Sequence, residues 1–125
     1  MAAILIAGAD QAALETLAAE AAGEGHTVLT AQDGQTAYEM ALAARPDILF
    51  LEPHMPALTG YETCSCIRSD PSFRPGLPVF ILAGEDYDPA ALRKCGATGR
   101  FPKEHFVQEL RDLLVKHLGA FAVPG

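Results

Sequence analysis

The stretch PDILFLEPHMPALTG, residues 46–60, carries the strongest fold signal in the chain. Residues 47–51 are short and apolar enough to form a strand that is buried on both faces, and this strand ends at a single carboxylate, Glu52. A loop with prolines and a glycine follows it. Open α/β sheets bind ligands beyond the carboxyl ends of their strands, so the pattern makes Glu52 the first candidate for a functional residue.

Short apolar runs alternate with helical patterns on both sides of this stretch. The alternation is typical of a parallel sheet with crossover helices. We expect strands at residues 3–7, 27–31, 47–51, 79–82 and 98–101, and helices at residues 11–22, 34–44, 61–68, 89–96 and 105–118. The predicted fold is therefore α/β and flavodoxin-like, a (βα)5 doubly wound parallel sheet of five strands in the order 2-1-3-4-5.

Four of the five predicted helices have apolar residues at helical spacing, and these are expected to face the sheet. The expected inward positions are Leu14, Leu17, Ala18 and Ala21, then Ala37, Met40 and Ala41, then Tyr61, Cys64 and Ile67, and finally Phe106, Leu110, Leu113, Leu114 and Leu118.

The length and charge of the chain limit its class. A chain of 125 residues suits one domain, which we expect at residues 1–119, with residues 120–125 as a C-terminal tail or the start of a linker. The net charge of −7 argues against binding to nucleic acid, which needs a basic face. The N-terminus lacks a signal-peptide pattern and no apolar run reaches about 18 residues, so no membrane association is expected. The expected location is the cytoplasm.

The three cysteines do not form a metal-binding pattern. Cys64 and Cys66 are two apart on a predicted helix, so their side chains should point to different sides of it. Cys95 has no histidine beside it to complete a ligand set. We interpret all three as reduced thiols of a cytoplasmic protein, and we expect no metal and no cofactor.

Four segments together resemble the receiver domain of bacterial two-component response regulators. They are ILIAGAD (4–10), AQDGQTAYEMALAARPDILFLEPHMPALTG (31–60), LPVFILAG (77–84) and CGATGRFPK (95–103), and the resemblance extends from residue 3 to about residue 118. In that family the first strand ends in an acidic pair, the third in a phosphoacceptor aspartate, the fourth in a hydroxyl residue and the fifth in a lysine. The matching positions are Gly8 and Ala9, Glu52, Ala83 and Lys103, and the aromatic switch residue falls on Arg100.

Of these pocket residues, only Lys103 matches the family pattern. Phosphoryl transfer onto a carboxylate depends on charge neutralisation, much of it by Mg²⁺ held by carboxylates, and Gly8 and Ala9 provide none. Ala83 has no hydroxyl to hold a phosphoryl oxygen. The resemblance therefore predicts a degenerate receiver, or pseudo-receiver, in which Glu52 pairs with Lys103. We expect this domain not to be an enzyme.

The preferred function is a phosphorylation-independent interaction module in two-component-type signalling. The family often binds partners through its fourth helix, fifth strand and fifth helix, which implies a protein partner at this face and leaves a homodimer open. The charged residues expected there are Arg93, Lys94, Arg100, Glu104, Glu109 and Arg111.

Five alternatives stay open at this point. Glu52 could accept a phosphoryl group from a histidine kinase or a small phosphodonor, or it could mimic the phosphorylated state permanently. An enzyme could use Glu52, His54 and Lys103 as acid, base and electrostatic clamp. The small residues Gly8, Ala9 and Gly84 could line a cavity for a ligand other than phosphate. The chain could also be part of a longer protein with an effector beyond Gly125, and that effector would then determine the output of this domain.

Overall fold

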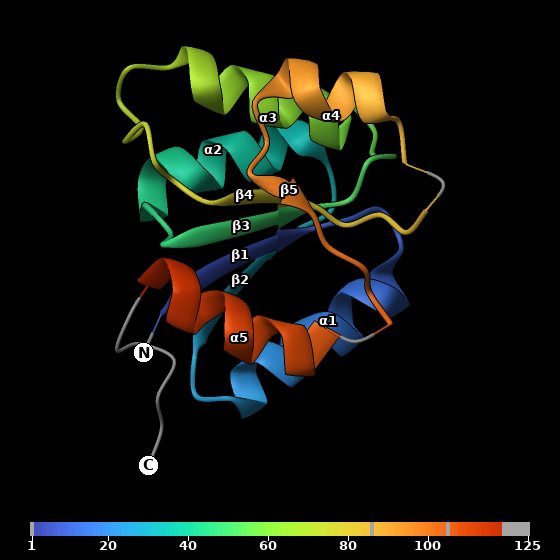
Figure 1. Ribbon diagram of the computed structural model, residues 1–125, viewed down its shortest axis with the longest axis vertical. Helices are drawn as coiled ribbons and strands as arrows, with labels where there is room; N and C mark the ends of the chain where they lie inside the picture. The colour runs from blue at the N-terminus through green and yellow to red at the C-terminus, as the bar shows by residue number, and fades with distance from the viewer. Residues whose placement is uncertain (1, 86, 105, 119–125) are drawn as a thin grey trace.

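The computed structural model describes residues 2–85, 87–104 and 106–118 and forms one five-stranded parallel sheet in the order β2-β1-β3-β4-β5 (Figure 1). This architecture confirms the predicted flavodoxin-like fold. The strands are β1 (Ala3–Ala7), β2 (Thr27–Ala31), β3 (Ile48–Leu51), β4 (Val79–Ile81) and β5 (Gly99–Arg100). The helices are α1 (Gln11–Gly23), α2 (Gly34–Ala44), α3 (Gly60–Ser69), α4 (Pro89–Cys95) and α5 (Phe106–Leu118).

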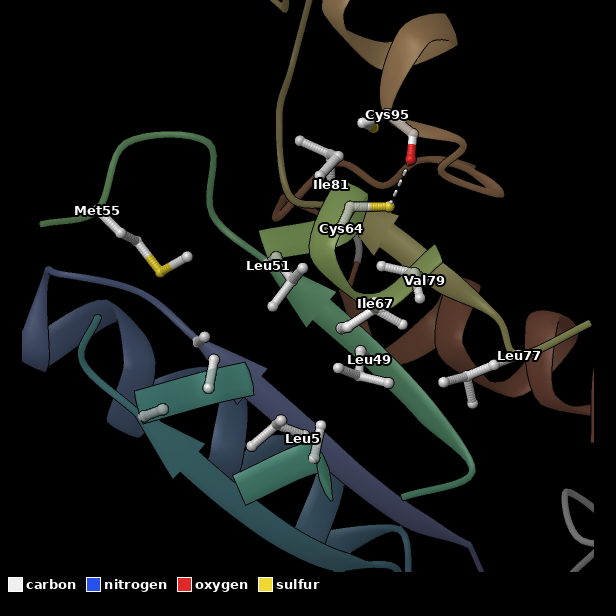
Figure 2. Close-up of a cluster of buried hydrophobic side chains, with 14 of the residues drawn as sticks. Leu5, Leu49, Leu51, Met55, Cys64, Ile67, Leu77, Val79, Ile81 and Cys95 are labelled. Atoms are coloured by element: carbon white, nitrogen blue, oxygen red, sulfur yellow. Dashed lines mark hydrogen bonds between the residues drawn. The ribbon is translucent and has the colours of Figure 1, made fainter. Parts of the chain in front are cut away.

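The helices form two layers, one on each face of the sheet. Helices α2, α3 and α4 cover one face, and α1 and α5 cover the other (Figure 1). Successive side chains of a strand point to opposite faces, so Leu49 and Leu51 of β3 join the core under α2 and α3, while Ile48 and Phe50 join the core under α1 and α5. Figure 2 shows the first of these cores, with leucine, isoleucine and valine side chains from β1, β3 and β4 against α3.

An aromatic cluster fills the second core. The rings of Phe50, Phe80, Phe101 and Phe106 form neighbouring pairs with centroids 5.0–5.9 Å apart. Phe50 and Phe80 belong to β3 and β4, and Phe101 directly follows β5. Each buried phenylalanine contributes on the order of 2–3 kcal/mol of hydrophobic free energy. The cluster therefore fixes α5, which begins at Phe106, against the sheet.

Side-chain caps set the first residue of four helices. The carboxylates of Asp10, Asp33 and Asp88 accept hydrogen bonds from backbone N–H groups three residues later, at 3.2, 2.7 and 3.1 Å. Thr59 and Glu62 form a reciprocal capping box at the start of α3. Asp10 is thus oriented toward its own helix, which removes it as a substitute for the missing acids of the first strand.

Some expected inward positions are less buried than predicted, although two of them, Met40 and Tyr61, still pack against the core under α2 and α3. Ala18, Met40 and Tyr61 are only half-buried. The Tyr61 hydroxyl accepts a hydrogen bond from the backbone N–H of Asp88 at 3.2 Å, and this polar partner keeps the ring at the edge of the core. Thr63 is fully buried in its place, because its hydroxyl is satisfied by the Thr59 carbonyl at 2.8 Å.

Element boundaries differ from the prediction by one or two residues. Strand β3 begins after Asp47, whose carboxylate accepts a hydrogen bond from the Ala3 N–H at 2.8 Å. Strand β5 has two residues where four were expected. The side chains of Leu114 and Leu118, residue 105 and the predicted domain end at 119 lie outside the described part of the chain. Among the described residues, no helix is both long and apolar enough to cross a membrane.

Candidate functional site

The carboxyl ends of β1, β3 and β4 bring Gly8, Glu52 and Ala83 together. Ala7 is in register with Leu51, and Glu52 continues the ladder by donating its backbone N–H to the Ala7 carbonyl at 2.9 Å. On the other side, Leu82 donates to the Leu51 carbonyl at 2.8 Å. Each of the three residues directly follows its strand or lies one residue beyond it, so parallel pairing alone places them at one edge of the sheet.

The loop after Glu52 is closed by backbone hydrogen bonds. The N–H of Gly60 donates to the Pro53 carbonyl at 3.1 Å, and the N–H of Gly34 donates to the Pro56 carbonyl at 3.3 Å. A Cβ at position 60 would lie 2.9 Å from the carbonyl carbon of Glu52, closer than side chains approach in folded proteins. Only glycine at this position lets α3 start so close to the acid.

Glu52 and Lys103 form the expected ion pair. The Lys103 Nζ lies 3.1 Å from Glu52 Oε2, and the two side chains are 40% and 13% exposed. Opposite charges about 4 Å apart attract by roughly 4 kcal/mol at an effective dielectric constant of 20, before desolvation is subtracted. Solvent around the lysine reduces the net contribution, typically to about 1 kcal/mol or less. The pair therefore determines where the carboxylate lies more than it stabilises the fold.

The second carboxylate oxygen of Glu52 lies over Gly8. A Cβ built on Gly8 would come within 2.6 Å of Glu52 Cδ and 2.9 Å of Cγ, and nearer still to Oε1. Oε1 is buried and has no hydrogen-bond partner among the described residues. Glu52 thus fills the space that a side chain at position 8 would occupy, and its carboxylate takes room that a ligand at Gly8 would need.

The residues present do not fit a divalent cation. Mg²⁺ requires a near-octahedral set of oxygens at about 2.0–2.1 Å. Here the Glu52 carboxylate has its Oε2 against the Lys103 ammonium and its Oε1 against Gly8. Ala9 has no ligand atom, and the Asp10 carboxylate caps α1. No group of three or more His, Cys, Asp or Glu side chains in the described ranges is arranged to hold a metal ion.

The remaining pocket positions lie where the sequence predicted but add no further chemistry. Ala83 is buried beside Glu52, and its methyl group cannot donate a hydrogen bond. His54 is exposed on the loop. The structure brings Glu52 and Lys103 together, and within the part of the chain that it describes no hydrogen bond links His54 to either of them.

Arg100 stacks on an aromatic ring that the sequence analysis did not single out. Its guanidinium carbon lies 4.7 Å from the ring centroid of Tyr87, in the segment between β4 and α4. Such cation–π contacts contribute about 0.5–1 kcal/mol at exposed sites. The signal in the sequence was Tyr87 itself, an aromatic residue directly before the Asp88 cap. The segment with Tyr87 follows β4, and β4 pairs with β5, which carries Arg100.

The six charged residues expected on one surface are divided by the structure. Arg111 points to α1 and forms a two-bond ion pair with Glu24, at 2.5 and 2.9 Å. This pair lowers the pKa of the Glu24 carboxyl, chiefly through the hydrogen bond from Arg111. Lys94 lines a groove between α3 and α4.

Arg100 and Glu109 remain together. They line a groove of about 380 Å³ along β5 and α5 with Thr98, Asp112, Leu113 and two phenylalanines, Phe80 and Phe101. Arg93 and Glu104 are exposed on α4 and just before α5, respectively.

The cysteines are free thiols in different environments. Cys64 is fully buried and its Sγ donates a hydrogen bond to the Cys95 carbonyl at 3.4 Å, linking α3 to the end of α4 (Figure 2). Burial raises the pKa of the Cys64 thiol to about 12, with a smaller contribution from the neighbouring Cys95. Cys66 is only partly buried on the other side of α3, as the helical spacing predicted.

Comparison with known proteins identifies the family. The model of the response regulator receiver domain matches residues 4–115, so the chain belongs to this family of two-component signalling domains. Response regulator MprA of Mycobacterium ulcerans is 36% identical over 109 residues, which cover 86% of this chain and 46% of that protein. Protein PilG of Pseudomonas aeruginosa is 32% identical over 99 residues, covering 78% of this chain and 73% of PilG.

Solved structures show the same architecture. The chemotaxis response regulator CheY4 of Vibrio cholerae superposes with a TM-score of 0.81 at 26% identity, covering 91% of this chain and 99% of CheY4. The receiver domain of the sensor histidine kinase PA1611 from Pseudomonas aeruginosa, solved with a magnesium ion in its active-site cleft, gives a TM-score of 0.85 at 22% identity, covering 95% and 98%. The chain spans about half the length of MprA.

Proposed function

We propose that this receiver domain is a pseudo-receiver, which binds its protein partner without being phosphorylated and is not an enzyme. The observation that supports this most strongly is the Glu52–Lys103 ion pair, because it joins the two charged side chains at the phosphorylation-pocket positions to each other. The negative charge of Glu52 is then neutralised by Lys103 of the same chain. We place the domain in the cytoplasm, as part of a two-component-type pathway.

Charge and space both oppose a phosphoryl group at Glu52. The group would add roughly −1.5 to −2 charges next to a single ammonium, Lys103. The attacking oxygen would be either Oε2, which is held by Lys103, or Oε1, which is buried against Gly8. Ala83 provides no hydroxyl, and the divalent cation that would offset the charge does not fit. These features favour a pocket in which Glu52 is not phosphorylated.

The partner surface that the geometry favours is the groove between β5 and α5. Arg100 projects from the edge strand of the sheet and is held by Tyr87, while Glu109 and Asp112 provide opposite charge along α5. A groove with charges of both signs around the apolar side chains of Phe101 and Leu113 suits a protein surface with complementary charges. The fixed Arg100–Tyr87 contact suits an interaction that is always available.

Phosphodonor chemistry provides the test of this function. The chain is incubated with acetyl phosphate and Mg²⁺ and its intact mass is measured, with a Glu52→Gln variant as the matched control. We expect no Mg²⁺-dependent increase in mass by one phosphoryl group. Stoichiometric modification that is absent from Glu52→Gln would instead establish Glu52 as a phosphoacceptor and end the pseudo-receiver proposal.

A further inference from the structure

We propose that Gly8 is a positioning residue for Glu52, and that the two form a matched pair which holds the carboxylate against Lys103 and excludes a divalent cation. This inference rests on the proposed function and deepens it. It replaces the view of Gly8 as a simple loss of an acid. The absent side chain at position 8 and the longer acid at position 52 become one coupled arrangement.

The backbone fixes the two residues side by side. The Glu52 N–H donates to the Ala7 carbonyl at 2.9 Å, while the Gly8 N–H donates to the Ala31 carbonyl at 3.0 Å on the other side of β1. Neither backbone can therefore move away without breaking the central ladder. A Cβ on residue 8 would lie 2.6 Å from Glu52 Cδ, so any side chain there must displace the Glu52 carboxylate.

One ion pair and the space over Gly8 define the observed position of the carboxylate. Its side chain is 13% exposed, Oε2 is bound by Lys103, and Oε1 is buried without a partner among the described residues. A buried oxygen without a donor is unfavourable, so hydrogen bonding to Oε1 does not explain this position. The open space over Gly8 and the attraction of Lys103 explain it together.

The pair also accounts for the poor fit of a cation. The substitution Glu52→Asp would withdraw the carboxylate by about one C–C bond, roughly 1.5 Å, and leave space over residue 8. With Glu52 in place, a new aspartate at position 8 would compete with Glu52 for the same volume. A carboxylate at position 8 therefore suits an aspartate at position 52 and would clash with the glutamate in its observed position.

A double-mutant cycle tests this coupling. The variants are Gly8→Ala, Glu52→Ala and the combination, with the exposed neighbour Ala9→Ser as control. We expect Gly8→Ala to lower the urea midpoint of unfolding when Glu52 is present and to have little effect when residue 52 is alanine. If Gly8→Ala does not fold, the combined variant should recover folding. Equal losses in both backgrounds would overturn the proposal.

Two further readouts separate positioning from general packing. In Gly8→Ala, the NMR signals of the Lys103 side chain should move to their positions in Glu52→Ala, whereas unchanged signals would contradict the proposal. Mg²⁺ should shift the spectrum of the double variant Gly8→Asp with Glu52→Asp and not that of Gly8→Asp, and binding by Gly8→Asp alone would overturn it. Phosphorylation of Glu52 in acetyl phosphate would end the proposed function yet leave this cycle intact, so the two failures are distinguishable.

Discussion

Lys103 Nζ lies 3.1 Å from Glu52 Oε2, which joins the end of β3 to the segment after β5 across 51 positions of sequence. In the receiver family these two positions serve the phosphorylation pocket, and here they bind each other. The loop from Glu52 to α3 and the chain leading into α5 are thereby connected at the carboxyl edge of the sheet. The consequences of this connection, and of the packing around it, can be measured.

The first prediction concerns the ion pair itself. Lys103→Met should lower the free energy of unfolding by about 1–2 kcal/mol, because it leaves the largely buried Glu52 carboxylate without a partner. Adding Glu52→Gln should recover most of that loss, since the buried charge is then removed as well. Urea denaturation of both variants measures the effect. A double variant less stable than Lys103→Met would contradict this account of the pair.

The second prediction concerns the helix that follows the Glu52 loop. The Glu62 N–H donates a hydrogen bond to Thr59 Oγ1 at 3.1 Å, and the Thr59 N–H donates one to the Glu62 carboxylate at 2.9 Å. Thr59→Ala should cost about 1 kcal/mol of stability, because an N-terminal N–H of α3 loses its acceptor. Thr59→Ser is the matched control and should be nearly neutral. A loss as large for serine as for alanine would show that the cap is not the cause.

The third prediction concerns the Cys64 thiol. Its pKa is raised to about 12 by burial, whereas the unfolded thiol has the usual value near 9. Cys64 should therefore resist iodoacetamide at pH 8, and Cys66 should react, as peptide mapping can show. The unfolded thiol ionises first as the pH rises, so this contribution to stability is complete below pH 9 and is lost between pH 9 and 12. Rapid labelling of Cys64 in the folded chain would contradict its burial.

The fourth prediction concerns Asp70 at the end of α3. Hydrogen bonds from the Tyr38 hydroxyl and from Ser72 lower the pKa of the Asp70 carboxyl below its ordinary value of 3.8. A lowered pKa stabilises the fold above pH 3.8, and this stabilisation is lost as the pH falls through the folded-state pKa. Tyr38→Phe should raise the pKa of Asp70, measured by NMR titration of its carboxyl carbon. An unchanged pKa would mean that the tyrosine hydroxyl is not the main cause.

The fifth prediction concerns the proposed partner surface. Arg100→Ala removes the cation at the β5–α5 groove; an arginine that acts as an interface hot spot contributes about 2 kcal/mol or more, so partner recovery should fall at least about tenfold. Arg111→Ala is the matched control, because Arg111 faces Glu24 and should leave recovery nearly unchanged. Affinity capture from the cells of origin, quantified by mass spectrometry, compares the two. Equal recovery with Arg100→Ala and the unmodified chain would place the partner elsewhere.

The fold was predictable because local and long-range signals agree. The apolar runs of β1 and β3 are buried on both faces, and capping residues such as Asp10 directly precede the helices. The strand order then follows from the resemblance and the alternating pattern. Tyr61 packs against the core as expected but is only half-buried, because helical spacing does not show where a hydroxyl finds its partner.

The sequence predicted which residues form the site, but it did not predict how their side chains lie. The sequence indicated that only Lys103 is unchanged while Gly8, Ala9, Glu52 and Ala83 depart from the family pattern, and the structure brings Glu52 and Lys103 together. That the Glu52 carboxylate lies over Gly8 could not be predicted, because it depends on a contact between adjacent strand ends rather than on any motif. The direction of Arg111 was missed for a similar reason, since its partner Glu24 follows a different helix.

The most direct test of the central claim is a pair of two-dimensional ¹H–¹⁵N NMR spectra of the chain, without and with Mg²⁺ and beryllofluoride. The ion pair between Glu52 and Lys103 is predicted to persist, so the amide signals of Gly8, Glu52, Ala83 and Lys103 should keep their positions. Saturable, Mg²⁺-dependent shifts centred on these four residues would contradict the claim that the pocket is closed to phosphoryl chemistry.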